Sequence, residues 1–500
     1  MTSFLPKPGL LPVAFATALL AACASTGGLQ PAAEPHRIDD HVLTRSLSGA
    51  PLSPAEFPAQ DWWRSLGDPQ LDALIAEAVQ GSPSLAAADA RVRKAQAQAG
   101  LADAERKPTL GASAQYVVAQ LPSGLAGDEI GGQLMHNAVL TLDFKWPLDV
   151  WGGKRADYLA ALGQAHASEI EAQAARLALA ANVARSYVAL AQAFDGLDVA
   201  NREAARSERL LGLSRQRVKA GIDSQLSMRN AEVSIAAAKA QAEVAQQRID
   251  SLRNAIAALL GASPDRGLAI ERPRLLQAPA PGLPSVLPSE LLGHRPDVVA
   301  ARWRVEAAAQ GIKSAKAKFK PSIDLSALVG LAATGFPGLF DNDALLGFGG
   351  PAISLPIFDG GRLRQNLASH DADYDLAVAG YDQTVVDGMH QVVDAVQAIR
   401  ALDAQSASLE QARASAAAAM DLANKRYHAG LANQLDVLAV QKPLLQIEQQ
   451  LVGVRAQRYA AAIDLDQALG GGLQPGAPPP TDSIGSNTSP SSTSTSATTP

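Results

Sequence analysis

The fold is decided by the turn Arg426-Tyr427-His428-Ala429-Gly430-Leu431, which joins two long helical stretches between Gly360 and Gly470. Before this turn, apolar residues recur every three or four positions, a spacing that keeps one face of a helix against a neighbouring helix. These residues are Tyr374, Val378, Tyr381, Val385, Gly388, Val392, Ala395, Ile399 and Leu402. No Pro interrupts residues 362–430, so the pattern predicts a helix on the order of 100 Å long. Such a helix needs partners along its whole length.

The same turn also occurs 209 residues earlier, as Arg217-Val218-Lys219-Ala220-Gly221-Ile222. That shift superposes Leu260-Gly261 on Leu469-Gly470, whereas Lys107-Pro108 and Lys320-Pro321 lie 213 residues apart. A change of offset marks a surface loop, where insertions and deletions are tolerated. We therefore predict a tandem repeat of about 200 residues in which each copy contains one long helical hairpin.

The N-terminus has the features of an export signal. Lys7 precedes an apolar run from Gly9 to Ala22 that is too short to span a bilayer. The run ends in Leu20-Ala21-Ala22-Cys23, which resembles a bacterial lipobox and predicts a lipidated Cys23 after signal cleavage. Ordinary cleavage near Ala22 is the alternative. Cys23 is the only cysteine in the chain, so an internal disulfide is excluded. Ala24 after it indicates sorting to the outer membrane.

Composition argues against several classes of function. The net charge of −6 and the lack of a Lys/Arg cluster argue against nucleic-acid binding. The 8 His residues show no metal-ligand spacing, and neither a Gly-x-Ser-x-Gly sequence nor a phosphate-binding loop is present. We therefore expect no enzymatic activity, no cofactor and no metal site. Aromatic residues make up only 4% of the chain, which favours Ala-rich helices packed closely together.

Strand periodicity replaces helical periodicity after Pro108. The clearest case alternates Leu140, Leu142, Phe144 and Trp146 with Thr141, Asp143 and Lys145. In an outer-membrane barrel this alternation places the apolar face against lipid and the polar face toward the lumen. The predicted strands are Thr109 to Leu121, Val139 to Pro147, Ser322 to Gly330 and Gly350 to Ile357. The Gly-rich segments 123–132 and 333–347 are predicted to be extracellular loops.

Four strands cannot close a barrel, and open strand edges are not tolerated in hydrocarbon. Single barrels start at about eight strands, so two chains would barely close one and three would supply about twelve. The sequence thus predicts a mixed fold, in which a trimer closes a membrane β-barrel that continues into a long α-helical coiled-coil barrel.

The predicted organisation of the chain follows from these signals. Between the two repeats, residues 263–288 contain too many Pro for a helix or an inner strand, so we expect an external connector. Pro443 lies inside the predicted return helix and should kink it. The predicted regions are a signal peptide (1–22), a periplasmic tether (23–60), repeat 1 (61–262), the connector (263–288), repeat 2 (289–471) and a disordered Pro/Ser/Thr-rich tail (472–500).

Over about residues 60 to 470 the chain resembles the outer-membrane efflux protein family, the TolC-like channel-tunnels, and within it the lipidated NodT-type branch. Four motifs carry the resemblance. They are the entry from Trp62-Trp63 to Ile75 with its Asp-Pro-Gln-Leu-Asp, the stretch from Leu287 to Arg295-Pro296-Asp297, the Gly-Gly-Lys/Arg helix starts at Gly152 and Gly360, and the two Ala-Gly turns.

The resemblance implies a homotrimer that acts as the passive exit duct of a tripartite efflux pump. A periplasmic adaptor would join the duct, embedded in outer-membrane lipid, to an inner-membrane transporter. The adaptor would dock at the hairpin tips, which correspond to Ala220, Gly221, Ile222, Ala429, Gly430 and Leu431. Alternatives are the outer-membrane duct of a type I protein secretion system, a structural coiled-coil periplasmic lipoprotein, and the pump's adaptor, which would normally carry only one hairpin.

The resemblance also implies a periplasmic gate near the second tip. The family closes its channel with a Tyr before the turn, an Arg after it and two acidic residues on the returning helix. Tyr427 and Asp436 match two of these positions, whereas Ala432 and Ala439 occupy the Arg position and the second acidic position. We therefore predict a looser closure, although Tyr427 could equally be a seam residue. The predicted gate residues are Tyr427, Asp436, Leu435 and Leu438.

Overall fold

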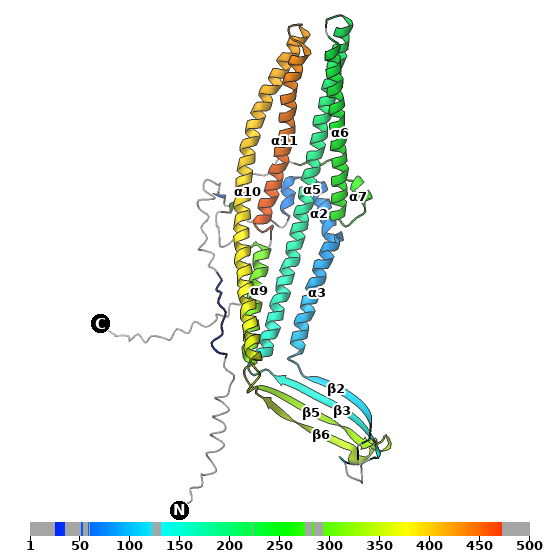
Figure 1. The fold of residues 1–500 in the computed structure, drawn as a ribbon, viewed down its shortest axis with the longest axis vertical. Coiled ribbons are helices and arrows are strands. Elements are labelled where there is room, and N and C mark those ends of the chain that lie inside the picture. Colours follow the sequence, from blue (N-terminus) through cyan, green and yellow to red (C-terminus); the bar gives the residue numbers. More distant parts are fainter. Residues whose placement is uncertain are drawn as a thin grey trace, which may run out of the picture.

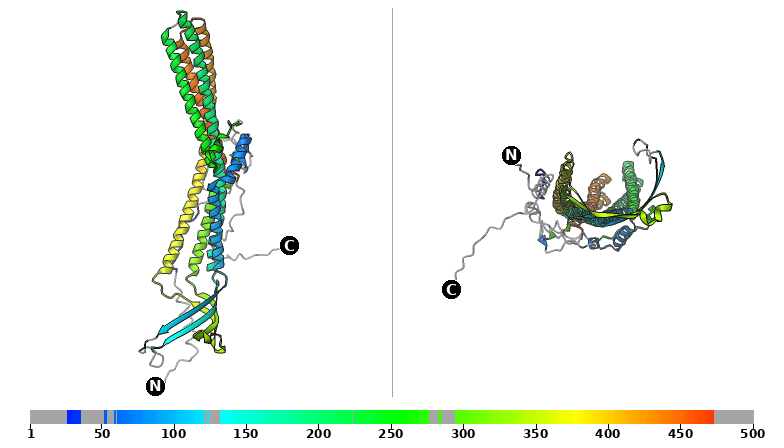
Figure 2. Two further views of the ribbon diagram at one scale, coloured as in Figure 1. Left: turned by 90° about the vertical axis from the view of Figure 1, so that its right-hand side faces the viewer. Right: turned by 90° about the horizontal axis from the view of Figure 1, so that it is seen from below.

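The computed structural model describes residues 26–35, 52–53, 59, 61–120, 122, 124, 132–222, 224–275, 283–284 and 294–472. The predicted signal peptide, Cys23 and residues 473–500 of the predicted tail lie outside the described residues. The protein is elongated, with paired helices at one end and a sheet at the other (Figure 1). Seen along its length, it curves into an arc that is open on one side (Figure 2).

Two helical hairpins of equal size form the long part of the molecule. The first consists of α5 (Gly153–Lys219, 67 residues) and α6 (Gln225–Leu259, 35 residues). The second consists of α10 (Arg362–His428, 67 residues) and α11 (Gln434–Ala468, 35 residues). At 1.5 Å per residue, α5 and α10 are each about 100 Å long. The predicted seam of α10 is confirmed, because all of its residues are buried except Leu402, which is partly buried.

Two shorter helices continue the return helices toward the sheet (Figure 1). They are α3 (Pro83–Ala104) and α9 (Pro296–Ala317), each beginning with Pro, whose fixed φ suits the first helical position. Gly261 (φ +73°) and Gly470 (φ +101°) end the return helices, and a side chain at either position would collide with the backbone just before α3 or α9. Only Gly allows this close end-to-end approach.

The four long strands form one antiparallel sheet in the order β2-β3-β5-β6. Leu142 pairs with Ala112 on one side and with Val329 on the other, so the two strand hairpins join through β3 and β5. Large apolar side chains stay exposed on this sheet, including Leu110 at 72% and Leu142 at 46%. The strands are β2 (Thr109–Gln120), β3 (Leu134–Leu148), β5 (Ser322–Thr334) and β6 (Leu345–Ser354).

Three predicted strand boundaries are wrong. β3 begins at Leu134, β5 extends to Thr334, and β6 covers Leu345–Ser354 in place of residues 350–357. The predicted loop 333–347 reached too far, because residues 345–347 already pair with β5. A Cβ at Gly349 would lie only 3.0 Å from the Ala327 side chain, so Gly permits the close strand approach. The connection between β5 and β6 instead holds two 3-10 turns, η3 (Pro337–Phe340) and η4 (Asn342–Ala344).

The Pro-rich connector contains more regular structure than expected. A short helix, α7 (Pro264–Leu268), begins at a proline, where the missing N–H costs nothing. Further on, β4 (Leu283–Pro284) pairs in parallel with β1 (Leu52–Ser53). The prediction that this connector excludes helix was therefore wrong. Pro443 does not interrupt α11, which is one helix from end to end.

The aromatic-led entry segment packs against the middle of α5. It forms η2 (Trp62–Leu66) and α2 (Pro69–Gly81), whose buried residues join the largest apolar cluster of the described chain. Asp68 caps α2 and accepts hydrogen bonds from the Tyr187 hydroxyl (2.7 Å) and the Arg274 backbone N–H (2.6 Å). The Asp-Pro-Gln sequence thus ties the entry helix to α5 and to the connector.

Residues 26–35 of the predicted tether run along α9 and α10 without helix or strand. The backbone N–H groups of Ala32 and Ala33 donate to the Asp375 carboxylate at 3.0 and 2.8 Å. Leu29 packs against the apolar cluster between the two helices. This part of the tether is therefore held against the helices on the sheet side of the molecule.

Candidate functional site

The two hairpin tips end in the same backbone motif. The N–H of Ile222 donates to the Arg217 carbonyl, and the N–H of Leu431 donates to the Arg426 carbonyl, both at 2.9 Å. Gly221 (φ +74°) and Gly430 (φ +76°) adopt the left-handed conformation that this helix ending requires. The adjoining Ala220 and Ala429 are exposed, as are Ile222 at 65% and Leu431 at 71%. Each tip thus presents a small apolar knob.

Tyr427, predicted as a gate residue, links the two hairpins within one subunit. Its side chain is fully buried, in a cluster with Leu210 of α5 and Val437 of α11. The guanidinium carbon of Arg217 lies 4.6 Å from the centre of the Tyr427 ring, and its Nη1 donates to the Tyr427 carbonyl at 3.4 Å. A cation at this position interacts favourably with both the ring and the C-terminal end of α10. Tyr427 is therefore a seam residue in the structure.

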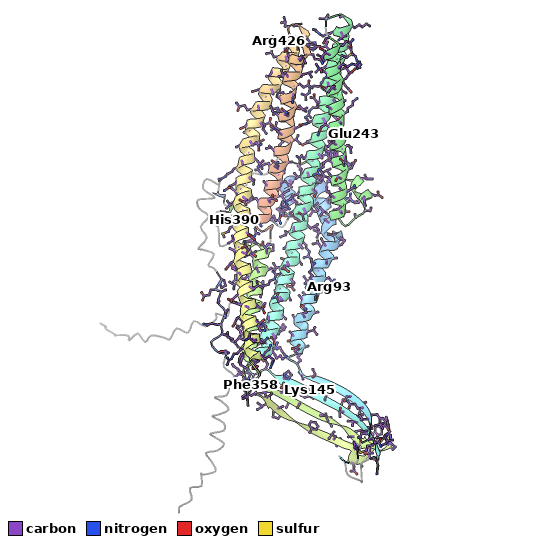
Figure 3. The ribbon with its side chains drawn as sticks, viewed as in Figure 1. Arg93, Lys145, Glu243, Phe358, His390 and Arg426 are labelled. Atoms are coloured by element: carbon purple, nitrogen blue, oxygen red, sulfur yellow. The ribbon has the colours of Figure 1, made fainter. Side chains whose placement is uncertain are left out.

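Sequence reasoning missed Arg217. The residue 209 positions later is Arg426, and both are basic residues in the last turn of a long helix. Arg426 lies exposed at the tip of the second hairpin (Figure 3). Arg217 covers an aromatic ring and Arg426 does not. The only sequence signal of this difference is that Tyr427 falls on Val218 when the chain is shifted by 209 residues.

Asp436 has a local role in the structure. Its carboxylate accepts from the Asn433 backbone N–H (2.8 Å), and its own N–H donates to the Asn433 side chain (3.1 Å). This reciprocal capping box satisfies two N–H groups at the start of α11. The structure thus places Asp436 on the exposed surface as a helix cap, whereas Tyr427 is buried on the far side of the turn.

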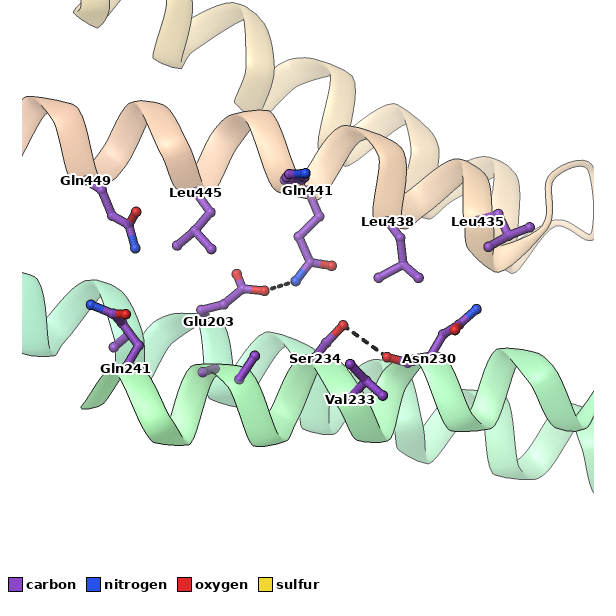
Figure 4. A pocket seen from close by; sticks show the side chains of 14 residues that line it. Glu203, Asn230, Val233, Ser234, Gln241, Leu435, Leu438, Gln441, Leu445 and Gln449 are labelled. Atoms are coloured by element: carbon purple, nitrogen blue, oxygen red, sulfur yellow. Dashed lines mark hydrogen bonds between the residues drawn. The ribbon is translucent and has the colours of Figure 1, made fainter. Parts of the chain in front are cut away.

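Leu435 and Leu438 line a groove between the two hairpins. The groove has a volume of about 580 Å³ and separates α6 from α11, with α5 as its floor (Figure 4). Its floor carries Glu203, 6% exposed, whose carboxylate accepts a hydrogen bond from the Gln441 side chain. The remaining lining is mixed, with apolar residues such as Val233 beside amides.

The contact between α5 and α11 combines apolar packing with ion pairs. Arg206 Nη2 donates to Glu448 Oε2 at 3.1 Å, and Arg185 Nε donates to Asp464 Oδ1 at 2.8 Å. Arg206 is also mostly buried, at 18% side-chain exposure. The Arg206–Glu448 pair is therefore shielded from water and costly to separate, because each partner would be left uncompensated, whereas the Arg185–Asp464 pair is partly exposed. We call this row of contacts the intra-subunit seam.

Two carboxyl groups on the second hairpin depart from ordinary acidity. Burial raises the pKa of Asp466, near the end of α11, to about 7. Burial also raises the pKa of Asp371 on α10, with nearby Lys316 opposing the shift. Within the described residues, neither carboxylate oxygen of Asp371 has a hydrogen-bond partner. Both groups therefore favour the protonated form more than a solvated carboxylate does.

The described residues contain no cluster of three or more His, Cys, Asp or Glu able to hold a metal ion. By length and composition α5 could cross a membrane, but half of its most apolar window is buried inside the protein.

The sequence profile of the family described as outer membrane efflux protein matches residues 74–262 and 287–471, one segment for each hairpin. Fusaric acid resistance protein FusA of Burkholderia cepacia is 40% identical over 71% of this chain and 67% of that protein. Multidrug resistance outer membrane protein MdtP of Escherichia coli K12 is 31% identical over 85% of this chain and 89% of that protein.

Solved structures show the same architecture. The outer membrane protein VceC of Vibrio cholerae superposes with a TM-score of 0.79 at 36% identity, covering 84% of this chain and all of that one. Both profile segments begin within or before a short helix and end at the close of a return helix. The chain therefore belongs to the outer membrane efflux protein family, and it is an outer-membrane channel of the tripartite efflux type.

Proposed function

We propose that three copies of this chain form the passive exit duct of a tripartite efflux pump. The observation that carries the proposal is the open sheet: β2 and β6 are its edges and each pairs on one side only within the described chain. Unpaired strand edges and an exposed apolar face are stable in hydrocarbon only when neighbouring copies complete the ring. Three four-stranded sheets give a twelve-stranded barrel, wide enough for an aqueous channel.

The mass of the purified protein in mild detergent tests the assembly. We expect about three times the 51.8 kDa chain, less the signal peptide, with heat-dependent migration on gels. The assembled protein should also conduct ions in planar bilayers. A monomer in mild detergent would overturn the proposal, because an open four-stranded sheet cannot span a membrane alone.

A tandem repeat underlies the rest of the proposal. The helices of the two hairpins agree in length and lie 209 residues apart, and both tips end in the same motif. Three copies would therefore surround the helical part of the duct with six hairpins of similar shape. The single coiled-coil rod considered as an alternative explains the helices but not the sheet.

The hairpin tips are proposed to dock the periplasmic adaptor, which connects the duct to an inner-membrane transporter. The support is the exposed apolar surface of Ile222 and Leu431 beside small residues, which allows another helical tip to approach closely. Photocrosslinkers placed at Ile222 or Leu431 should capture the adaptor in cells. A crosslinker at Glu271, exposed on the connector far from both tips, serves as the control.

Small molecules are the favoured cargo, since FusA and MdtP are named for fusaric acid and multidrug resistance. The test compares how well cells tolerate toxic compounds when the gene is deleted and when the protein is restored. The protein secretion alternative predicts instead the loss of a secreted polypeptide with unchanged drug tolerance. A channel of this kind moves its cargo without chemical change, so we expect no enzymatic activity.

The closed state is proposed to depend on Tyr427, Asp436, Leu435 and Leu438. Asp436→Asn removes one charge while retaining an acceptor for the helix cap, so its effect reports on the gate more cleanly than Asp436→Ala. We expect a larger open fraction in planar bilayers for Asp436→Asn. An unchanged closed fraction would remove Asp436 from the gate.

Cys23 is proposed to carry the lipid anchor. Cells labelled with radioactive palmitate should mark the wild-type protein and leave the Cys23→Ser protein unlabelled. Label on both proteins would show that the lipid is attached elsewhere. No label on either protein would show that the chain carries no such lipid. If Cys23 carries the lipid, residues 26–35, which are held against α9 and α10, follow the anchor almost directly in the chain.

A further inference from the structure

Basic residues are concentrated where the helices meet the sheet. Three segments cross this junction: residues 149–155 lead into α5, residues 313–324 run from α9 into β5, and residues 359–364 open α10. Together they hold 8 basic and 3 acidic residues, whereas the whole chain has a net charge of −6. We call the eight basic residues the basic collar. They are Lys154, Arg155, Lys313, Lys316, Lys318, Lys320, Arg362 and Arg364.

The acidic residues of these segments leave most of the collar charge uncompensated. Two of them cap helices, since Asp149 accepts a hydrogen bond from the Lys154 backbone N–H (3.0 Å) and Asp359 accepts one from the Leu363 backbone N–H (2.8 Å). Five collar residues are exposed and form no ion pair with another described residue. They are Arg155, Lys318, Lys320, Arg362 and Arg364. The collar therefore presents excess positive charge to its surroundings.

Large apolar side chains are exposed among these basic residues. They are Val150, Trp151, Ile357 and Phe358. Phe358 is 91% exposed and lies at the junction of the helices and the sheet (Figure 3). The Trp151 ring is fixed in place, because its Nε1 donates to the Pro321 carbonyl at 2.7 Å. Exposed aromatic and basic residues side by side are typical of a surface at a membrane–water interface.

The apolar face of the sheet runs up to the collar. Trp146 pairs with Leu325, and Leu148 pairs with Ile323 at the end of the sheet nearest the helices. Aromatic residues flank the lipid-facing band of a membrane barrel on both sides. Here Trp146 lies at the helix end of that face and Tyr116 toward the far end of β2. The collar thus lies just beyond the apolar band, at the level of the lipid headgroups on the periplasmic side.

Lys320 has the best-defined surroundings of the collar residues. Its Nζ lies 4.7 Å from the centre of the Trp151 ring, a distance at which the ring attracts a cation. An ammonium group has three N–H donors, so contact with the ring leaves donors available for phosphate oxygens. Lys318, the C-cap residue of α9, adds a second exposed ammonium two residues earlier.

We propose that the basic collar binds the anionic headgroups of phospholipids in the periplasmic leaflet of the outer membrane, with Lys318 and Lys320 as its main contacts. The inference rests on the proposed function, which places the sheet in that membrane. Each basic side chain close to an anionic lipid surface strengthens binding by about fivefold. A zwitterionic headgroup has no net charge, so the collar selects the lipids around the barrel by their charge.

Native mass spectrometry of the purified protein in mild detergent tests the proposal. The protein is titrated with phosphatidylglycerol and, separately, with phosphatidylcholine of the same acyl chains, and the spectra resolve each bound lipid. The test variant is Lys318→Gln with Lys320→Gln. Its matched control is Lys219→Gln with Lys425→Gln, which removes two exposed lysines from the last turns of α5 and α10, next to the hairpin tips.

We expect the wild-type protein and the control to bind phosphatidylglycerol at least about 25-fold more tightly than phosphatidylcholine, since two lysines contribute about fivefold each. The collar variant should lose about 25-fold of this preference. A wild-type protein without preference would overturn the proposal. So would a collar variant that keeps the full preference, or a control that loses as much of it.

Two further readings of the same spectra separate the remaining explanations. Inorganic phosphate at the lipid concentration should leave bound phosphatidylglycerol in place, because it has no acyl chains to lie against the apolar face of the sheet. Displacement by inorganic phosphate would assign the collar to a soluble anion and overturn the lipid assignment. The mass also reports the assembly: a monomer refutes the proposed trimer, whereas a trimer without lipid preference refutes this inference alone.

Discussion

Removing the Arg217–Tyr427 contact should loosen the second hairpin tip without unfolding the protein. Arg217→Met keeps the apolar stem of the side chain and deletes the charge, and Tyr427→Leu deletes the ring. Tyr427 is fully buried, and the guanidinium of Arg217, which belongs to α5, also donates a hydrogen bond to the Tyr427 carbonyl at the C-terminal end of α10. A desolvated cation–ring contact contributes about 2 kcal/mol, and a cation at a helix C-terminus about 0.5–1 kcal/mol.

We therefore expect Arg217→Met to lower the free energy of local opening at the tip by about 2–3 kcal/mol. Tyr427→Leu should lower the free energy of local opening by a similar amount through the lost contact. It should lower it by about a further 2–3 kcal/mol because a smaller side chain fills the buried site less well. In the double variant the shared contact is lost only once, so the coupling energy should be about 2 kcal/mol.

Hydrogen exchange of backbone amides in residues 425–437 measures local opening directly. Tyr427→Phe is the matched control, because it retains the ring that Arg217 covers. Amides in residues 372–385, at the other end of α10, should exchange at the wild-type rate in every variant. A coupling energy near zero, or faster exchange for Tyr427→Phe equal to that of Tyr427→Leu, would refute the contact as the origin of the stability.

Two further predictions concern the second hairpin. Gly388→Ala should destabilise the protein by about 1–3 kcal/mol, because a Cβ there would lie 2.9 Å from Arg295 Nε. Gly380 faces open space, so Gly380→Ala should stabilise the helix by up to about 1 kcal/mol. The thermal unfolding temperatures of the two variants measure both effects. Asp466→Asn should unfold at a higher temperature than wild type above pH 7, since burial raises the pKa of Asp466 from 3.8 to about 7 and the native state therefore favours the proton. The stability that the Asp466 proton provides is complete below pH 3.8 and is lost as the pH rises through 7, so the advantage of Asp466→Asn should vanish in acid.

Much of the helical architecture was predictable because its causes are local. The 3.6-residue period of apolar side chains set the buried face of α10, and Gly at the turn set where each helix ends. The bounds of α10 accordingly match the predicted residues 362–430 within two residues. The strand bounds were less accurate, because both ends of the predicted loop 333–347 belong to strands, and residues 345–347 are held in β6 only through their pairing with β5.

The sequence alone thus determined the length of the helices and the position of both tips, because hydrophobic period and backbone conformation are properties of neighbouring residues. Only the tertiary structure decided what Tyr427 contacts. Its partner Arg217 lies 210 residues away, brought there by packing between the hairpins, and the position 209 residues before Tyr427 holds Val218, which has no ring. A side-chain contact depends on both surfaces at once, and a linear pattern describes only one of them.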